Sequence, residues 1–301
     1  QMSKKSLLIV ASLAYDGIET KENKVDNILG GAGTYICLSL KHFNSEYSII
    51  SVVGNDFKSQ DLKLLESCGV DISGIKIEEN DKTFYWSCIY TDNFKERITT
   101  KTELNVMANF NPVIPNEKSK PDILLLGNLH PEIQLSAINQ LNNKPSAIIL
   151  DTMNYWIENF WETVKEVISK VDIISINDEE SEMITGQKDI SKAASALHAM
   201  GPKFVIIKKG KKGAELFNYK KRYVTGVYDV EKVLDPTGAG DCFIGGISGF
   251  LSQSDKISFE SIKSAIDYGT SLASFNVEEM GTKNLLNLSM NDIQKRVNKL
   301  K

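Results

Sequence analysis

Short apolar runs, each long enough for one buried strand, recur along the chain with amphipathic segments between them. Such runs are typical of parallel strands buried on both faces, and the segments between them are typical of covering helices. We therefore predict an α/β fold of three layers, α/β/α, with a mainly parallel central sheet. The expected strands lie at residues 7–11, 48–53, 123–126, 147–150, 173–176 and 204–208, and the clearest helices at 59–67 and 190–200.

Two stretches, about 12–29 and 75–107, break this rhythm. In the second stretch apolar and polar residues alternate, and a turn is expected at 79–81, a pattern typical of antiparallel strands with one solvated face. No repeat or low-complexity linker divides the chain. We predict one domain over residues 1–301 with a small antiparallel β lid, whose exposed edge is suited to pairing across a homodimer.

The overall charge excludes some classes of partner. The chain has 35 Lys and Arg against 39 Asp and Glu, a net charge of −4, which is too balanced to favour nucleic acid or an anionic membrane. No apolar run approaches the roughly 20 residues that cross a bilayer. The four cysteines form no CxxC pair, which favours buried free thiols and a cytoplasmic protein. Any bound anion must therefore be held by a local site.

The segment DPTGAGD at residues 235–241 offers such a site. It runs into a helix-length stretch that begins near Gly240, and the first turn of a helix has unpaired N–H groups and a partial positive charge. Gly238, Ala239 and Gly240 would let a phosphate approach these groups and form an anion hole. Asp241 would then lie where its carboxylate could take a proton from an attacking hydroxyl. Small residues farther along this helix, such as Gly245 and Gly246, predict close packing on its surface.

A plainer interpretation is that Asp241 supports a helix start and that the glycines form a tight turn. The longer string DPTGAGD, however, resembles the second signature of the ribokinase-like (PfkB) carbohydrate kinase family, D-T-x-G-A-G-D. The resemblance implies an ATP-dependent kinase with Asp241 as the catalytic base and Mg²⁺ carried with ATP. A monovalent cation is a further cofactor candidate within this family.

Other elements resemble the family in the same order along the chain. Asp16 and the pair Gly30-Gly31 resemble its substrate-binding strand and di-glycine hinge. NDEE at residues 177–180 resembles its N-x-x-E element, which implies that Asn177 and Glu180 organise phosphates and, through water, Mg²⁺. The resemblance implies further nucleotide-binding residues: Lys208, Gly210, Gly213, Thr237 and Asn276.

Each element also has a structural interpretation. NDEE is compatible with an ordinary helix start, because acidic residues favour the positive end of the helix dipole. Lysines at 209, 211 and 212 are compatible with a solvated loop, and Gly30 and Gly31 with a plain turn. What these alternatives do not explain is the shared order and spacing of the elements.

One position departs from the family pattern. Four residues after Gly31 the family commonly has an Asn that holds the sugar, and this chain has Tyr35. A phenol lacks the paired donor and acceptor of an amide, but its ring could stack on a base or fill space. Other candidates for the acceptor pocket are Thr83, Arg97 and Asn128, with His130 either lining the pocket or serving as a structural histidine. Arg97 could alternatively pair with Glu96 or Glu103.

The sequence contains no Walker A, HRD, DFG, HExxH or complete G-x-G-x-x-G pattern, which disfavours the corresponding enzymes. We expect transfer of phosphate from ATP to a hydroxyl of a small sugar-like acceptor. Two alternatives remain open: a nucleoside kinase, in which Tyr35, Phe84, Tyr85 or Trp86 stacks on the base, and a non-catalytic ligand-binding member of the fold.

Overall fold

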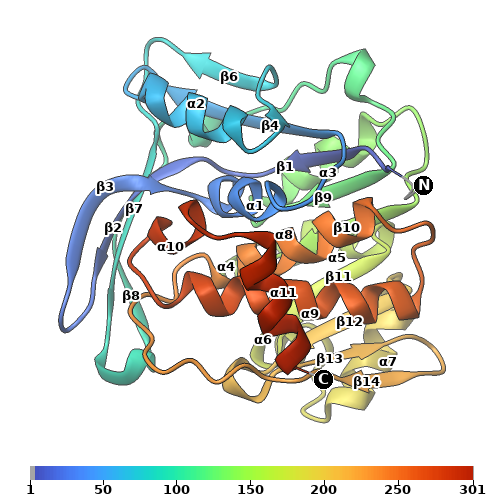
Figure 1. The fold of residues 1–301 in the computed structure, drawn as a ribbon. Coiled ribbons are helices and arrows are strands. Elements are labelled where there is room, and N and C mark those ends of the chain that lie inside the picture. The colour runs from blue at the N-terminus through green and yellow to red at the C-terminus, as the bar shows by residue number, and fades with distance from the viewer. Residues whose placement is uncertain (1–3, 301) are drawn as a thin grey trace.

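The computed structural model describes residues 4–300 and contains two sheets and their covering helices (Figure 1). The larger sheet has ten strands in the order β14-β13-β12-β11-β10-β9-β1-β4-β5, with β6 also paired to β4. Pairing is parallel except at β12–β13 and β13–β14. The bounds of its strands are β1 Leu7–Val10, β4 Tyr47–Gly54, β5 Val70–Asp71, β6 Ile75–Glu78, β9 Ile123–Leu126, β10 Ala147–Asp151, β11 Ile173–Asn177, β12 Phe204–Lys208, β13 Ala214–Phe217 and β14 Arg222–Val224. The predicted mainly parallel sheet is confirmed.

Helices cover both faces of this sheet, because successive residues of each buried strand point to opposite sides. Leu7 and Ile9 belong to a core that includes residues of α1, α8, α9 and α11, whereas Leu8 and Val10 belong to a second core with α3, α5 and α7. The helices are α1 Ala32–Leu40, α2 Ser59–Ser67, α3 Pro131–Asn139, α4 Asn154–Asn159, α5 Trp161–Lys170, α6 Asp178–Thr185, α7 Ile190–Met200, α8 Ala239–Ser252, α9 Phe259–Asn276, α10 Lys283–Leu286 and α11 Met290–Lys299, with short 3-10 turns at Asp92–Phe94, Asn105–Asn109, Asn116–Lys118 and Gly210–Lys212. The predicted three layers are therefore present.

The small residues of α8 are explained by its neighbours. A Cβ on Gly245 would lie 3.0 Å from the Cβ of Ser39 in α1, and one on Gly246 would lie 2.8 Å from the Cα of Gly269 in α9. Larger side chains would push these helices apart, and packed cores tolerate such insertions poorly. The close packing predicted for this helix is confirmed, and it fixes α8 between α1 and α9.

The smaller sheet stands at one edge of the molecule and has the order β3-β2-β7-β8 (Figure 1). Its strands are β2 Ala14–Glu19, β3 Lys24–Gly30, β7 Phe84–Tyr90 and β8 Arg97–Glu103. The pairs β2–β3 and β7–β8 are antiparallel, and β2 joins β7 in parallel. Residues 75–78, which we expected in the lid, instead form β6 and pair with β4 of the larger sheet. Alternation alone did not distinguish the two sheets.

The four cysteines are buried and free. Within residues 4–300, no helix combines the length and the apolarity that a membrane crossing requires.

Candidate active site

The candidate site lies where the parallel strands end and α8 begins. Asp151 closes β10, Asn177 closes β11 and Lys208 closes β12, and these three strands are neighbours in the sheet. Asn177 and Lys208 are direct partners in the register of β11 and β12. In α/β proteins ligands bind outside the carboxyl ends of the strands, so the sheet order itself gathers the charged side chains here.

The anion hole begins at Gly238, which caps the N-terminus of α8 with a positive φ of 81°. This left-handed conformation is one that glycine adopts without a steric penalty. A Cβ on Gly240, in the first turn, would lie 3.5 Å from Nζ of Lys208. The N–H of Ala239 donates to the Pro236 carbonyl at 3.2 Å, so the predicted contribution of Ala239 to the anion hole is not supported. The N–H groups of Gly238 and Gly240 make no hydrogen bond within residues 4–300, and together with the nearby Lys208 ammonium they are suited to an anion.

The loop before α8 is held by buried hydrogen bonds. Asp235 accepts from the backbone N–H of Thr237 at 2.9 Å and of Gly281 at 2.8 Å. Asn276 donates its side-chain N–H to the carbonyl of Thr237 at 2.7 Å. We predicted Thr237 and Asn276 as nucleotide-binding residues. Both are buried, and their hydrogen bonds support the backbone of the anion hole.

Asp241 occupies the third position of α8 and is partly exposed at the site. Burial, together with the negative charges of Asp151 and Asp16, raises the pKa of its carboxyl to about 8, although Lys208 and Arg97 act in the opposite direction. A general base works best when its pKa is near the working pH. The surroundings of Asp241 therefore suit it to take a proton.

Asp151 is a site residue that the sequence interpretation missed. Its side chain is buried, and burial raises its pKa while the charge of Lys208 lowers it. Two hydroxyl oxygens nearby in the chain or the sheet, Oγ1 of Thr152 and Oγ of Ser175, are buried without a hydrogen-bond partner among the described residues. An Asp directly after an apolar run, at the same relative place as Asn177, was the available signal.

The charges around Asp241 predict opposite pH shifts for two variants. Asp151→Asn removes a negative charge that raises the pKa of Asp241, so the rise of kcat/KM with pH should move to lower pH. Lys208→Met removes a positive charge, so the same rise should move to higher pH. Measuring kcat/KM at low concentrations of both substrates reports the free enzyme. Shifts in the same direction for both variants would contradict this electrostatic assignment.

Asn177 and Glu180 form a reciprocal capping box at the start of α6. Asn177 Oδ1 accepts from the Glu180 N–H at 2.7 Å, and Glu180 Oε2 accepts from the Asn177 N–H at 2.9 Å. The structural interpretation of NDEE is thus realised. Among residues 4–300 the second oxygen of Glu180, Oε1, makes no hydrogen bond, and burial raises the pKa of this carboxyl to about 7.

That free carboxylate oxygen is the feature that fits Mg²⁺, which takes oxygen ligands and is commonly bound through one or two carboxylates plus substrate phosphates. No group of three or more His, Cys, Asp or Glu side chains that could hold a metal occurs in the described part of the chain. The free oxygen of Glu180 therefore fits a cation that arrives with phosphates.

On the acceptor side, Asp16 lies against the di-glycine. A Cβ on Gly30 would lie 1.9 Å from Oδ2 of Asp16, so any side chain there would displace this carboxylate. Gly31 has a φ of 83°, and a Cβ on it would lie 2.8 Å from the Ser12 carbonyl oxygen. Burial raises the pKa of Asp16 to about 7, opposed by an N–H bond from Gly31. The structure thus brings Asp16, Gly30 and Gly31 together.

Tyr35 lies deeper than its candidate role requires. It is 1% exposed, and a Cβ on Gly238 would lie 2.4 Å from its ring. Its hydroxyl is buried without a hydrogen-bond partner among the described residues. Stacking of Tyr35 on an acceptor is therefore not supported, because its ring fills the space beneath the anion hole.

The inner face of the lid carries Trp86 and Arg97. Trp86 is the register partner of Asp16, so both side chains lie on one face of the sheet. The Arg97 guanidinium lies 5.3 Å from the centre of the Trp86 ring. Glu103 pairs with Lys101, and Arg97 makes no ion pair within the described residues. Tyr85 lies on the opposite face, where it donates to Asp26 at 2.5 Å.

The other acceptor candidates have structural partners. The Thr83 hydroxyl accepts from the Gly54 N–H at 3.0 Å. The Asn128 amide accepts from Trp156 Nε1 at 2.8 Å and donates to Met153 Sδ at 3.1 Å. His130 caps α3 by accepting from the Glu132 N–H at 3.1 Å. These hydrogen bonds give Thr83, Asn128 and His130 structural roles that do not require a bound acceptor.

In the loop after β12, the interpretation of the lysines as solvated is confirmed in part. Lys209 pairs with Glu215 at 2.6 Å, and Lys211 and Lys212 are exposed. Gly210 and Gly213 both have positive φ angles, 56° and 83°. They shape the turn that leads away from Lys208, the lysine that faces the anion hole.

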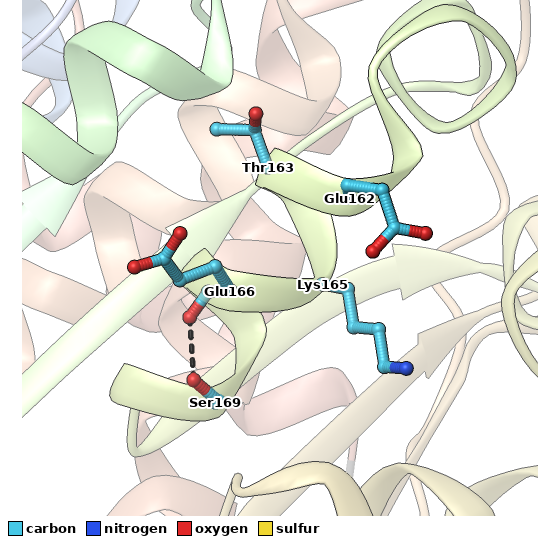
Figure 2. Close-up of a pocket in the computed structure, with 5 residues that line it drawn as sticks. All are labelled: Glu162, Thr163, Lys165, Glu166 and Ser169. Atoms are coloured by element: carbon cyan, nitrogen blue, oxygen red, sulfur yellow. Dashed lines mark hydrogen bonds between the residues drawn. The ribbon is translucent and has the colours of Figure 1, made fainter.

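A shallow hollow elsewhere does not compete with this site. Figure 2 shows Glu162, Thr163, Lys165, Glu166 and Ser169, all on α5, with Ser169 donating to the Glu166 carbonyl at 2.6 Å. These are side chains of one solvated helix, without convergent groups from another element.

Comparisons with known proteins agree with this geometry. A family model described as pfkB family carbohydrate kinase matches residues 5–288. A cytidine kinase from Thermococcus kodakarensis is 28% identical over 245 residues, 80% of this chain and 86% of that protein. A ribokinase from Staphylococcus aureus is 31% identical over 123 residues, 39% of each chain. A structure from E. coli, assigned to ribokinase II and holding ATP and Mg²⁺, has a TM-score of 0.83 at 17% identity and covers 98% of this chain and 99% of the other. The predicted ribokinase-like fold is confirmed.

Proposed function

Because the chain belongs to the pfkB family of carbohydrate kinases, we propose that it transfers the γ-phosphoryl group of ATP to a hydroxyl of a nucleoside, with Asp241 as the base. Its activity as a small-molecule kinase, acting with ATP on a sugar-like or nucleoside acceptor, follows from the family. One observation carries the catalytic half: Asp241 lies at the start of α8, beside free amides and Lys208. A non-catalytic member would not need this arrangement.

In the proposed reaction, Asp241 takes the proton of the acceptor hydroxyl as its oxygen bonds to the γ-phosphorus. The bond from that phosphorus to the β–γ bridging oxygen breaks, and ADP leaves. The amides of Gly238 and Gly240 and the Lys208 ammonium stabilise the charge on the phosphoryl oxygens. Glu180 would hold Mg²⁺ beside the phosphates, and the ion would neutralise phosphate charge when bound.

Two findings favour a nucleoside over a free sugar. The cytidine kinase matches 80% of this chain, whereas the ribokinase matches 39%. Trp86 is the register neighbour of Asp16 on the inner lid face. An acceptor whose ribose hydroxyls bind Asp16 would present its base towards this indole, and base–aromatic stacking stabilises by about 1–3 kcal/mol.

An acceptor panel tests this proposal. We expect ADP release to show higher kcat/KM for at least one nucleoside than for ribose, fructose or other free sugars. The Asp241→Asn variant, assayed in parallel, measures the background ATP hydrolysis, which is then subtracted. A free sugar that surpasses every nucleoside would overturn the nucleoside assignment and leave the kinase assignment intact.

Within the same panel, Trp86→Ala should lower kcat/KM for the preferred nucleoside by about 5- to 150-fold, the equivalent of the stacking energy. The slow turnover of free ribose should be unaffected, because ribose has no base. Equal losses with both acceptors would show that Trp86 supports the lid rather than the base.

A further inference from the structure

A buried hydrogen bond joins the lid to the loop that forms the anion hole. Tyr90, the last residue of β7, lies with its hydroxyl 2.8 Å from Oγ1 of Thr237, and the two residues are 7% and 8% exposed. A second polar contact between lid and body is exposed, since Lys232 Nζ lies 2.6 Å from Glu22 Oε2 and both side chains are more than half exposed. The first contact reaches the loop that forms the anion hole, whereas the second joins two exposed side chains.

Thr237 directly precedes Gly238, the N-cap of α8. Its N–H donates to Asp235 and its carbonyl accepts from Asn276, so the body fixes its backbone. Its side-chain hydroxyl contacts Tyr90 of the lid and also the carboxylate of Asp235 in the body, where the hydrogen bond from the Thr237 side chain lowers the pKa of Asp235. The position of the Gly238 amide thus depends on several hydrogen bonds of Thr237, of which the one to Tyr90 exists when the lid is in contact with the body.

The ring of Tyr90 is packed into the inner face of the lid. It packs in one apolar cluster with Ile18 and Cys88, and Met280 of the body lies against the same cluster. A Cβ on Gly281, whose N–H donates to Asp235, would lie 2.7 Å from Cδ1 of Ile28 in β3. The lid therefore contacts the anion-hole loop and the segment that supports it at adjacent points.

We propose that Tyr90 is a positioning residue for phosphoryl transfer, which couples lid closure to the anion hole through its hydrogen bond to Thr237. The inference rests on the proposed kinase mechanism. With the lid shut, the bond holds Thr237 and the adjacent Gly238 amide in the geometry that receives the phosphoryl oxygens. With the lid raised, both hydroxyls return to water and that restraint is absent. Transfer to water before the acceptor is enclosed would then be slow.

The test is Tyr90→Phe, which keeps the ring in the apolar cluster and removes the hydroxyl. We expect kcat to fall about 10-fold or more, while the Kd values for ATP and acceptor, measured by calorimetry, change less than about twofold. Thr237→Val should give at least the same loss, because it also removes the Thr237 side-chain bond to Asp235, and Thr237→Ser, which keeps the hydroxyl, should retain most of kcat. The variant that combines Tyr90→Phe with Thr237→Val should lose no more than Thr237→Val alone, because the bond that Tyr90→Phe removes is already absent there.

Glu22→Gln is the matched control, because it weakens the exposed lid contact and should leave kcat unchanged. Unchanged kcat in Tyr90→Phe, or losses that multiply in the double variant, would overturn the coupling. Lower thermal stability with an unchanged kcat would assign the bond to packing alone. If Asp241→Asn inactivates while Tyr90→Phe does not, the coupling fails and the kinase mechanism stands. If Asp241→Asn retains full turnover, the mechanism itself fails.

Discussion

Replacing Asp241 by Asn is expected to lower kcat by about 10²- to 10⁴-fold, the range typical of a lost general base. The amide cannot accept the proton of the acceptor hydroxyl, although it is close in size to the carboxylate. The affinity for ATP should stay near that of the unmodified protein, since the α8 amides and Lys208 remain in place. Steady-state kinetics together with calorimetric titration of ATP measures both quantities.

The chain offers a matched control for the helix-start interpretation of Asp241. Asp292 occupies the same third position of α11, is likewise partly exposed, and accepts from Ser289 in a capping box. Asp292→Asn should slightly lower the free energy of unfolding and leave kcat unchanged. If Asp241→Asn behaves like this control, with retained turnover, Asp241 is a helix-start residue and the catalytic assignment is wrong.

Periodicity predicted the body of the fold well because its strands are buried on both faces. The strand at 204–208 and the helices at 59–67 and 190–200 have the predicted bounds, and α7 begins where Asp189 caps it. The lid was harder to delimit. Residues 75–78 alternate like lid strands but pair with β4, and such pairing is decided by tertiary contacts that alternation does not encode.

The site divides in the same way between local and long-range information. DPTGAGD and NDEE are contiguous, so their geometry at helix starts could be predicted from spacing. Asp151 could not, because a single Asp after a strand has no spacing signature, and its place near Lys208 depends on the strand order β10-β11-β12. The Tyr90–Thr237 bond spans 147 residues. The depth of Tyr35 likewise depends on how α1 packs on α8.

The packing of Tyr35 beneath Gly238 leads to the second large effect. Gly238→Ala should lower the free energy of unfolding by about 2–5 kcal/mol, the sum of about 1–2 kcal/mol for a left-handed non-glycine residue and about 1–3 kcal/mol for overpacking against the ring. It should also lower kcat about 100-fold, because a displaced amide no longer meets the developing phosphoryl charge. Urea unfolding and steady-state kinetics measure the two losses.

Gly186→Ala separates the two causes. Gly186 ends α6 with a φ of 70°, and no atom would lie within 4 Å of an added Cβ, so this variant has the backbone penalty without the clash. It should lose about 1–2 kcal/mol and no activity. Adding Tyr35→Leu to Gly238→Ala should recover part of the lost stability, because the smaller side chain leaves room for the methyl group. Equal losses in Gly238→Ala and Gly186→Ala, with no recovery in the double variant, would show that the ring does not support the anion hole. Recovery of stability without recovery of kcat would instead show that the ring both fills the space under Gly238 and sets the direction of its amide.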